Sequence, residues 1–189
     1  MRRIPIVPTL LVLAAVAEMV HLGFWQIDRL HEKEALLASY VQAQRQPRLA
    51  PWPRTDDEAT RSLYRRAAVT CVRVTERSAM AGRNTRDEAG LAQTAQCDLA
   101  GGGSAKVVLG WSRQPVAGRE WRGGAVVGTI APGPRLVADP PLAGLEANER
   151  PDPSEIPNNH LSYAVQWFLF ALTALVIYAV ALRRRLRDA

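Results

Sequence analysis

Two side chains near the end of the chain have the types and spacing of a haem-binding pair. His160 comes just before a long apolar stretch, and Trp167 follows seven residues later. Seven residues make two helical turns, so both side chains project from one face, about 10 Å apart along the axis. A neutral imidazole is a strong axial ligand for haem iron, and an indole can pack against the porphyrin. In the alternative, His160 only anchors the helix at the membrane interface and Trp167 faces lipid.

His21 lies inside a second apolar stretch, near the start of the chain. An ionisable side chain within a membrane span is a candidate functional group by default. Near the outer end of its span, His21 could face His160 across a helix pair and complete a bis-histidine site. It could equally pair with Glu18, three residues back on the same helix face.

These side chains would be positioned by two membrane-spanning helices. Residues 161–182 contain no charged residue, and at about 1.5 Å per residue they can cross a hydrocarbon core of roughly 30 Å. Arg2 and Arg3 precede the first span, and a basic cluster at 183–187 follows the second. Because basic residues near a span are retained on the inner side, both termini are predicted to be cytoplasmic and the middle of the chain extracytoplasmic.

The start of the chain also resembles a secretory signal, with Ala-Val-Ala at 15–17 as a cleavage site. Against cleavage, the apolar pattern continues to Phe24 and Trp25, an aromatic pair suited to the membrane interface. The formal net charge of +6 comes mostly from the two tails, so it is a signal of topology. No stripe of basic and aromatic residues predicts nucleic-acid binding, so the bilayer is the expected partner of the basic tails.

Between the spans, the apolar period changes from helical to strand-like. Four short runs bounded by glycines predict antiparallel strands, at 64–75, 91–99, 105–111 and 125–130. The prolines between 131 and 157 argue against a long helix there. The expected fold class is therefore membrane-anchored α+β, with two transmembrane helices flanking a small antiparallel β-sheet or barrel-like extracytoplasmic domain.

The sequence predicts six consecutive segments. They are a cytoplasmic tail (1–3), a transmembrane helix (4–26), a membrane-proximal helix (27–46), an extracytoplasmic β domain with a proline-rich return segment (47–157), a second transmembrane helix (158–182) and a cytoplasmic tail (183–189).

Cys71 and Cys97 are the two cysteines of the chain, and both fall in predicted strands. Outside the cytoplasm they could form a disulfide that closes a loop of about 25 residues and contributes about 3 kcal/mol. Two buried thiols are an equal alternative, because cysteines on non-adjacent strands cannot be bridged. The middle segment offers no nucleophile beside a general base, so the chain is not expected to be an enzyme.

Two longer motifs, one at each span, resemble the end signatures of the Surfeit locus protein 1 family. Residues 22–29 read Leu-Gly-Phe-Trp-Gln-Ile-Asp-Arg, and the family signature has the form Leu-Gly-x-Trp-Gln-x-x-Arg. Residues 158–168 read Asn-Asn-His-Leu-Ser-Tyr-Ala-Val-Gln-Trp-Phe, against Asn-Asn-His-x-x-Tyr-Ala-x-x-Trp-Phe. Between them, Leu109 stands where the family has an arginine before Gly-Trp, and Cys71 stands where it tends to have glycine. Both departures concern the middle domain and leave the end signatures intact.

The resemblance implies an assembly factor for haem-copper terminal oxidases in the bacterial inner membrane. It implies binding of haem a at the outer face and help with its insertion into subunit I of cytochrome c oxidase, alongside the haem a synthase. The ligand histidine of the family falls on His160 and its tryptophan on Trp167, while Trp25 and Arg29 belong to the first signature. Arg29 could hold a haem propionate. The alternative is a cofactor-free docking protein that stabilises subunit I during assembly.

Overall fold

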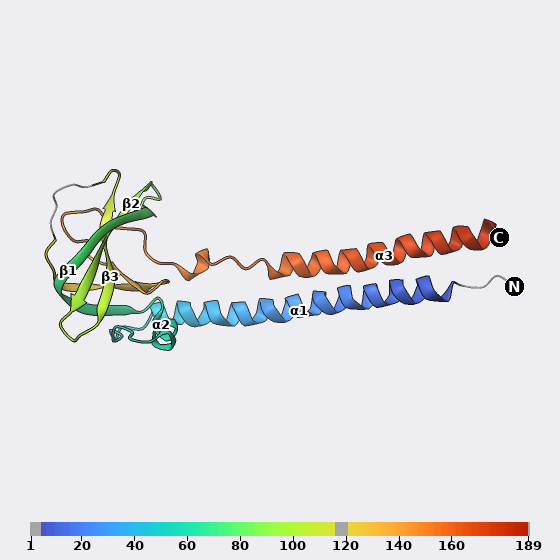
Figure 1. Cartoon of the computed structure of the whole chain (residues 1–189), viewed down its shortest axis with the longest axis horizontal. Helices are drawn as coiled ribbons and strands as arrows, with labels where there is room; N and C mark the ends of the chain where they lie inside the picture. Colours follow the sequence, from blue (N-terminus) through green and yellow to red (C-terminus); the bar gives the residue numbers. More distant parts are fainter. Residues whose placement is uncertain (1–4, 116–120, 189) are drawn as a thin grey trace. The chain divides into compact units, whose positions relative to one another are not determined.

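The computed structural model describes residues 5–115 and 121–188, and it divides into two compact units (Figure 1). One unit holds two long helical segments, in residues 5–36 and 156–188, and the other is a β domain formed by residues 37–155. Helix α1 (Ile6–Gln44) runs without a break from the first unit into the second, and α3 (His160–Asp188) belongs to the first. Both helices are candidate membrane spans by length and composition.

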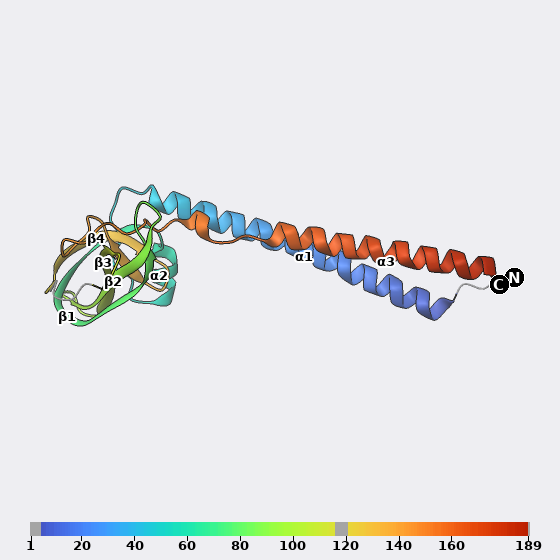
Figure 2. The ribbon, with the colours of Figure 1, turned by 90° about the horizontal axis from the view of Figure 1, so that it is seen from above.

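Within the helical unit, α1 and α3 run antiparallel and side by side (Figures 1 and 2). Among the partly or fully buried residues of α1, one series recurs every three or four positions and defines one face of the helix. The series is Thr9, Val12, Val16, Met19, Gly23, Gln26 and Leu30. The corresponding face of α3 contains Ala164, Trp167, Ala171, Ala174 and Tyr178. The helices touch near both ends, where the hydroxyl groups of Thr9 and Tyr178 share a hydrogen bond and Phe24 packs edge-on against Phe168, with ring centroids 5.4 Å apart.

Gly23 allows the two helices to approach closely at the level of that aromatic contact. A Cβ atom on Gly23 would lie 2.6 Å from the ring of Phe168, which is closer than carbon atoms pack. The position therefore needs glycine, or the ring of Phe168 must move.

Replacement of Gly23 by leucine is expected to weaken the helix pair, because overpacking of a close contact costs about 1–3 kcal/mol. Cysteines introduced at Thr9 and Tyr178 report the effect, since these side chains touch. Oxidative cross-linking of that pair should slow at least about fivefold in Gly23→Leu. The control Ala15→Leu, at an exposed position of α1, should leave the rate unchanged. Equal rates in the two variants would contradict the close approach at Gly23.

The β domain is a closed five-stranded barrel with the strand order β1-β2-β3-β5-β4. Its strands are β1 (Arg66–Arg83), β2 (Ala89–Leu99), β3 (Ser104–Ser112), β4 (Gly124–Ala131) and β5 (Arg135–Ala138). A short helix, α2 (Asp56–Ser62), precedes β1, and a 3-10 turn, η1 (Pro153–Glu155), lies in the return segment. Alternate residues of the strands point inward, and the core includes Val107, Val126 and Ile130.

The expected fold class is confirmed: two long apolar helices flank a small β domain. The sheet is mixed rather than wholly antiparallel, because β5 pairs parallel with β3 and antiparallel with β4. The sequence patterns missed β5. It has only four residues and directly follows Pro132-Gly133-Pro134, so it lacks both the length and the surroundings that usually mark a strand.

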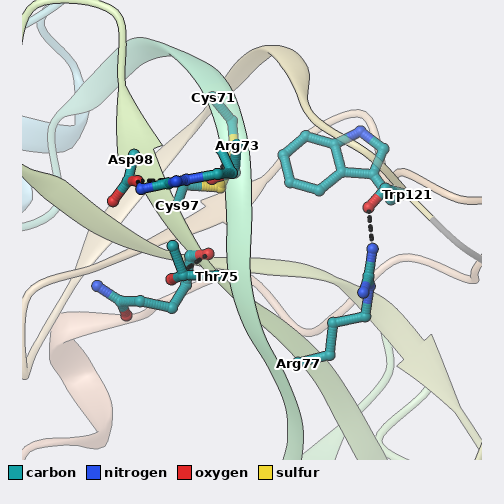
Figure 3. The surroundings of a disulfide bond; sticks show 8 residues. Cys71, Arg73, Thr75, Arg77, Cys97, Asp98 and Trp121 are labelled. Carbon is teal, nitrogen blue, oxygen red and sulfur yellow. Dashed lines mark hydrogen bonds and ion pairs between the residues drawn. A yellow bond between two sulfur atoms is a disulfide. The ribbon is translucent and has the colours of Figure 1, made fainter.

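Cys71 and Cys97 are joined by a disulfide between the neighbouring strands β1 and β2, with their Cα atoms 5.3 Å apart (Figure 3). The register alone does not place them opposite each other, because Cys71 pairs with Leu99 and Cys97 with Val74. The register shifts twice along this part of β1, as at a β-bulge. Both cysteines are almost fully buried, so the bond links the strands from inside the barrel core.

Candidate functional site

His160 is the first residue of α3, and its ring is held by a side chain from the other helix. The Nδ1 atom lies 2.7 Å from Oε1 of Gln26 in α1, and the pair is partly buried. An amide oxygen can only accept, so the ring donates its Nδ1–H to Gln26. A hydrogen bond of this kind to the second ring nitrogen orients histidines that ligate metals. The arrangement thus presents Nε2 as an available ligand atom.

The segment that leads into α3 adds a polar atom without a partner. The amide N–H of Tyr163 donates to the backbone oxygen of Asn159, so α3 begins regularly. Two residues before His160, the side-chain Oδ1 of Asn158 is buried and accepts no hydrogen bond within the described part of the chain. Buried acceptors are normally satisfied, so this one requires a donor from water or from a bound molecule.

Trp167 lies on the same side of α3 as His160 and is partly buried. The ring of Trp167 packs edge-on against Phe170, with centroids 6.1 Å apart. Ala164, which is almost fully buried, separates the two positions. Tyr163, in contrast, is half exposed. The buried residue between imidazole and indole is therefore small and apolar.

The residues of the first signature lie mostly away from His160. Trp25 is 48% exposed. Arg29 lies about one turn beyond Gln26 and forms an exposed ion pair with Glu32, with 2.6 Å between Nη1 and Oε2. Neither side chain has a contact with the imidazole in the described residues.

His21 is not brought to His160. Its side chain is exposed, and it lies five positions before Gln26, which is a rotation of about 140° around the helix axis. Because Gln26 is the residue that faces His160, His21 points away from α3. Of the two alternatives for His21, the structure does not support the one in which it faces His160 across the helix pair.

The β domain contains a polar cavity of about 400 Å³. Two arginines in its wall, Arg66 and Arg150, share the carboxylate of Asp139 at 3.8 and 3.5 Å. Their charges are thus partly neutralised, which makes the cavity a poor site for anions. Tyr64 also lines the cavity, is almost fully buried and has a positive φ of 62°.

Burial raises the pKa of Tyr64 above its ordinary value of about 10, and the neighbouring Tyr40 and Glu155 add to the effect. The unfolded chain therefore loses this proton first, so stability is expected to fall as the pH rises above about 10. Absorbance at 295 nm, measured for wild type and Tyr64→Phe, isolates the titration of this phenol. The variant should also lose less stability at alkaline pH. A difference curve with a midpoint at or below 10 would contradict the buried position.

These features define a class: a membrane protein with two apolar helices, a small β domain between them in sequence, and an imidazole held at a helix–helix contact. A comparison with family models matches residues 13–172 to the model described as the SURF1 family. The match covers most of the chain, including Gln26, the whole barrel and His160, so the chain belongs to this family. No curated protein matches it. The family comprises cytochrome oxidase assembly factors and is not a known class of enzyme.

Proposed function

We propose that this protein carries haem a for oxidase assembly, with Nε2 of His160 as the protein ligand of the iron. The observation that supports the proposal best is the hydrogen bond from Nδ1 of His160 to Gln26. It holds the ring in one orientation and leaves Nε2 without a competing partner among the described residues. A histidine that merely anchored the helix would need no such orientation.

The residues around His160 fit a porphyrin. The unpaired Oδ1 of Asn158 can accept from the hydroxyl group that haem a carries on its farnesyl side chain. The apolar residues of α3, with Trp167 two turns away, suit the macrocycle. Arg29 is available for a propionate, because its exposed pair with Glu32 contributes less than about 1 kcal/mol and can be exchanged.

The bound haem would supply a Lewis-acidic iron and a redox centre destined for the oxidase. The residues of the chain itself bind and orient the haem. Gln26 orients the imidazole, His160 donates an electron pair, and the helices keep the site at the edge of the bilayer. A single protein ligand would hold haem less tightly than two, which suits a protein that must release its cargo.

The membrane arrangement is part of the proposal. Both termini are cytoplasmic, because arginines flank both apolar stretches at their terminal ends. The β domain then lies in the periplasm of a bacterial inner membrane, where a buried disulfide is stable. His160 then lies at the periplasmic face of the inner membrane. The partners are the haem a synthase and subunit I of cytochrome c oxidase.

Purification of the full chain from cells that make haem a tests this function. Extracted pigment should be haem a, in substoichiometric amount, and should be absent when the cells lack haem a synthase. Subunit I should co-purify with the coloured protein. A colourless protein that still co-purifies with subunit I would contradict haem carriage and favour the docking function. A haem of another type in the extract would contradict the assignment of the cargo.

A further inference from the structure

The face of α1 that is turned away from α3 carries two ionisable residues inside the apolar stretch. Glu18 and His21 are both exposed. Relative to Gly23, which contacts α3, they are rotated by about 140° and 160° around the helix. Trp25, 48% exposed, lies on the same side. We refer to the exposed face formed by Ala14, Ala17, Glu18, His21 and Trp25 as the outer stripe.

The depth of these residues makes their exposure costly. The apolar stretch ends at Trp25, so His21 lies about 6 Å and Glu18 about 10 Å inside the hydrocarbon region. Side chains of this kind almost always face protein or water within the membrane.

Within the described residues of the helical unit, no protein surface covers this face of α1. Helix α3 covers the opposite face of α1, at Gly23 and Gln26. Glu18 and His21 have the spacing for a mutual hydrogen bond, but within the described residues neither has a hydrogen-bond or ion-pair partner. Deeper along the same face, Ala14 and Ala17 are small and exposed. Small residues are enriched where transmembrane helices approach closely.

We infer that the outer stripe docks a transmembrane helix of a different protein, which carries a cationic or hydrogen-bond-donating side chain at the depth of Glu18. Charge complementarity identifies the occupant. The carboxyl oxygens of Glu18 can accept from a donor, His21 can share it, and the alanines provide room for a helix backbone. The inference depends on the membrane placement of α1 and not on haem binding.

A second copy of this chain fits the outer stripe less well. Two copies inserted in the same direction pair around an axis along the membrane normal, so equivalent residues meet at equal depth. Glu18 of one copy would then approach Glu18 of the other, and the two His21 side chains would also meet. Like charges at this depth oppose association, whereas a different helix can offer a complementary group.

Site-specific photocross-linking of the full chain in native membranes tests the inference. The probe is p-benzoylphenylalanine at position 10, where Leu10 is 61% exposed and lies on the same side of α1 as the outer stripe. The same probe at position 172 serves as control, because Leu172 is 57% exposed on the other helix. The position-10 adduct should map by mass spectrometry to a transmembrane helix of another protein, with a Lys, Arg, His, Ser, Thr, Asn or Gln at the depth of Glu18.

Removal of the polar groups should then weaken this adduct specifically. In the double variant Glu18→Leu, His21→Leu, its yield should fall about three- to fifteenfold, which corresponds to one intramembrane hydrogen bond. Adducts from position 172 and the haem content should not change. Glu18→Lys, combined with glutamate at the mapped donor, should restore the yield.

Three outcomes would overturn the inference: adducts with a second copy alone, adducts with lipid alone, or an undiminished yield in the double variant. Failure of the proposed function is distinguishable, since it would show as absent haem with an unchanged adduct.

Discussion

Replacement of His160 by alanine should abolish the Soret band of the haem a complex, with affinity lowered more than about a hundredfold. The imidazole would hold the iron in the proposed complex, and within the described residues no other histidine lies near enough to replace it. The measurement is a haem a titration of purified full-length wild type and His160→Ala, followed by absorbance. Circular dichroism of both proteins should agree, because His160 is only partly buried at the start of α3.

Two matched variants show whether the geometry accounts for this loss. Gln26→Ala keeps the ligand but frees its ring, so affinity should fall about ten- to hundredfold. Gln26→Glu retains an acceptor and should recover most of the affinity, with a lower reduction potential, because a carboxylate makes the imidazole more basic. His21→Ala should leave the titration unchanged. If His21→Ala loses the band while His160→Ala keeps it, the ligand assignment is wrong.

Loss of the disulfide should have the second largest effect, now on the stability of the β domain. The bond closes a loop with a sequence separation of 26 residues, for which chain entropy predicts about 3 kcal/mol. For a domain of this size, that corresponds to a fall in melting temperature of more than about 10 °C. Thermal unfolding of the Cys71→Ala, Cys97→Ala double variant, followed by near-ultraviolet circular dichroism, measures the effect.

Reduction provides the control for this prediction. Wild type and the double variant should unfold at nearly the same temperature in dithiothreitol, apart from the small volume lost with the sulfur atoms. Without reductant, wild type should be the more stable. An equal melting temperature under oxidising conditions would show that the bond contributes nothing to the folded domain. Haem binding should persist in the double variant at low temperature, since His160 lies in the other unit.

Much of the fold was predictable because long periodic segments carry strong signals. The apolar stretches indicated both helices, and β-branched runs indicated four of the five strands. β5 was missed for the reasons given above, and the second half of β1 because the pattern weakens after Thr75: from Glu76 to Ala81 the strand is exposed. Pairing of the cysteines could not be predicted, since it depends on the register between β1 and β2, and β-bulges shift that register.

The departure at Leu109 from the family pattern has a simple structural consequence. Leu109 is 5% exposed and belongs to the barrel core. An arginine is rarely buried without a partner, so leucine here adds apolar contact within the domain. This substitution concerns packing of the barrel and leaves the residues around His160 unaffected.

The candidate site was only partly predictable from spacing. His160 and Trp167 do share one side of α3, because that depends on a single helix. Contacts between helices depend on how both are rotated, which a period alone does not reveal for residues 134 positions apart. Gln26 was therefore identified only as part of a family motif, and His21 was left open between facing His160 and pairing with Glu18. The sequence did contain a signal for this contact. The face of α1 defined by Thr9, Val16 and Gly23 includes Gln26 and excludes His21.

The most direct test of the proposed site uses the small number of histidines. The chain has three, so the double variant His21→Leu, His31→Asn leaves His160 alone. Resonance Raman spectroscopy of its ferrous haem a complex, with and without ¹⁵N-labelled histidine, reports the iron–imidazole bond. We expect an iron–histidine stretching band that shifts on labelling and changes frequency in Gln26→Ala. Absence of the band, or a band insensitive to the label, would contradict coordination by His160.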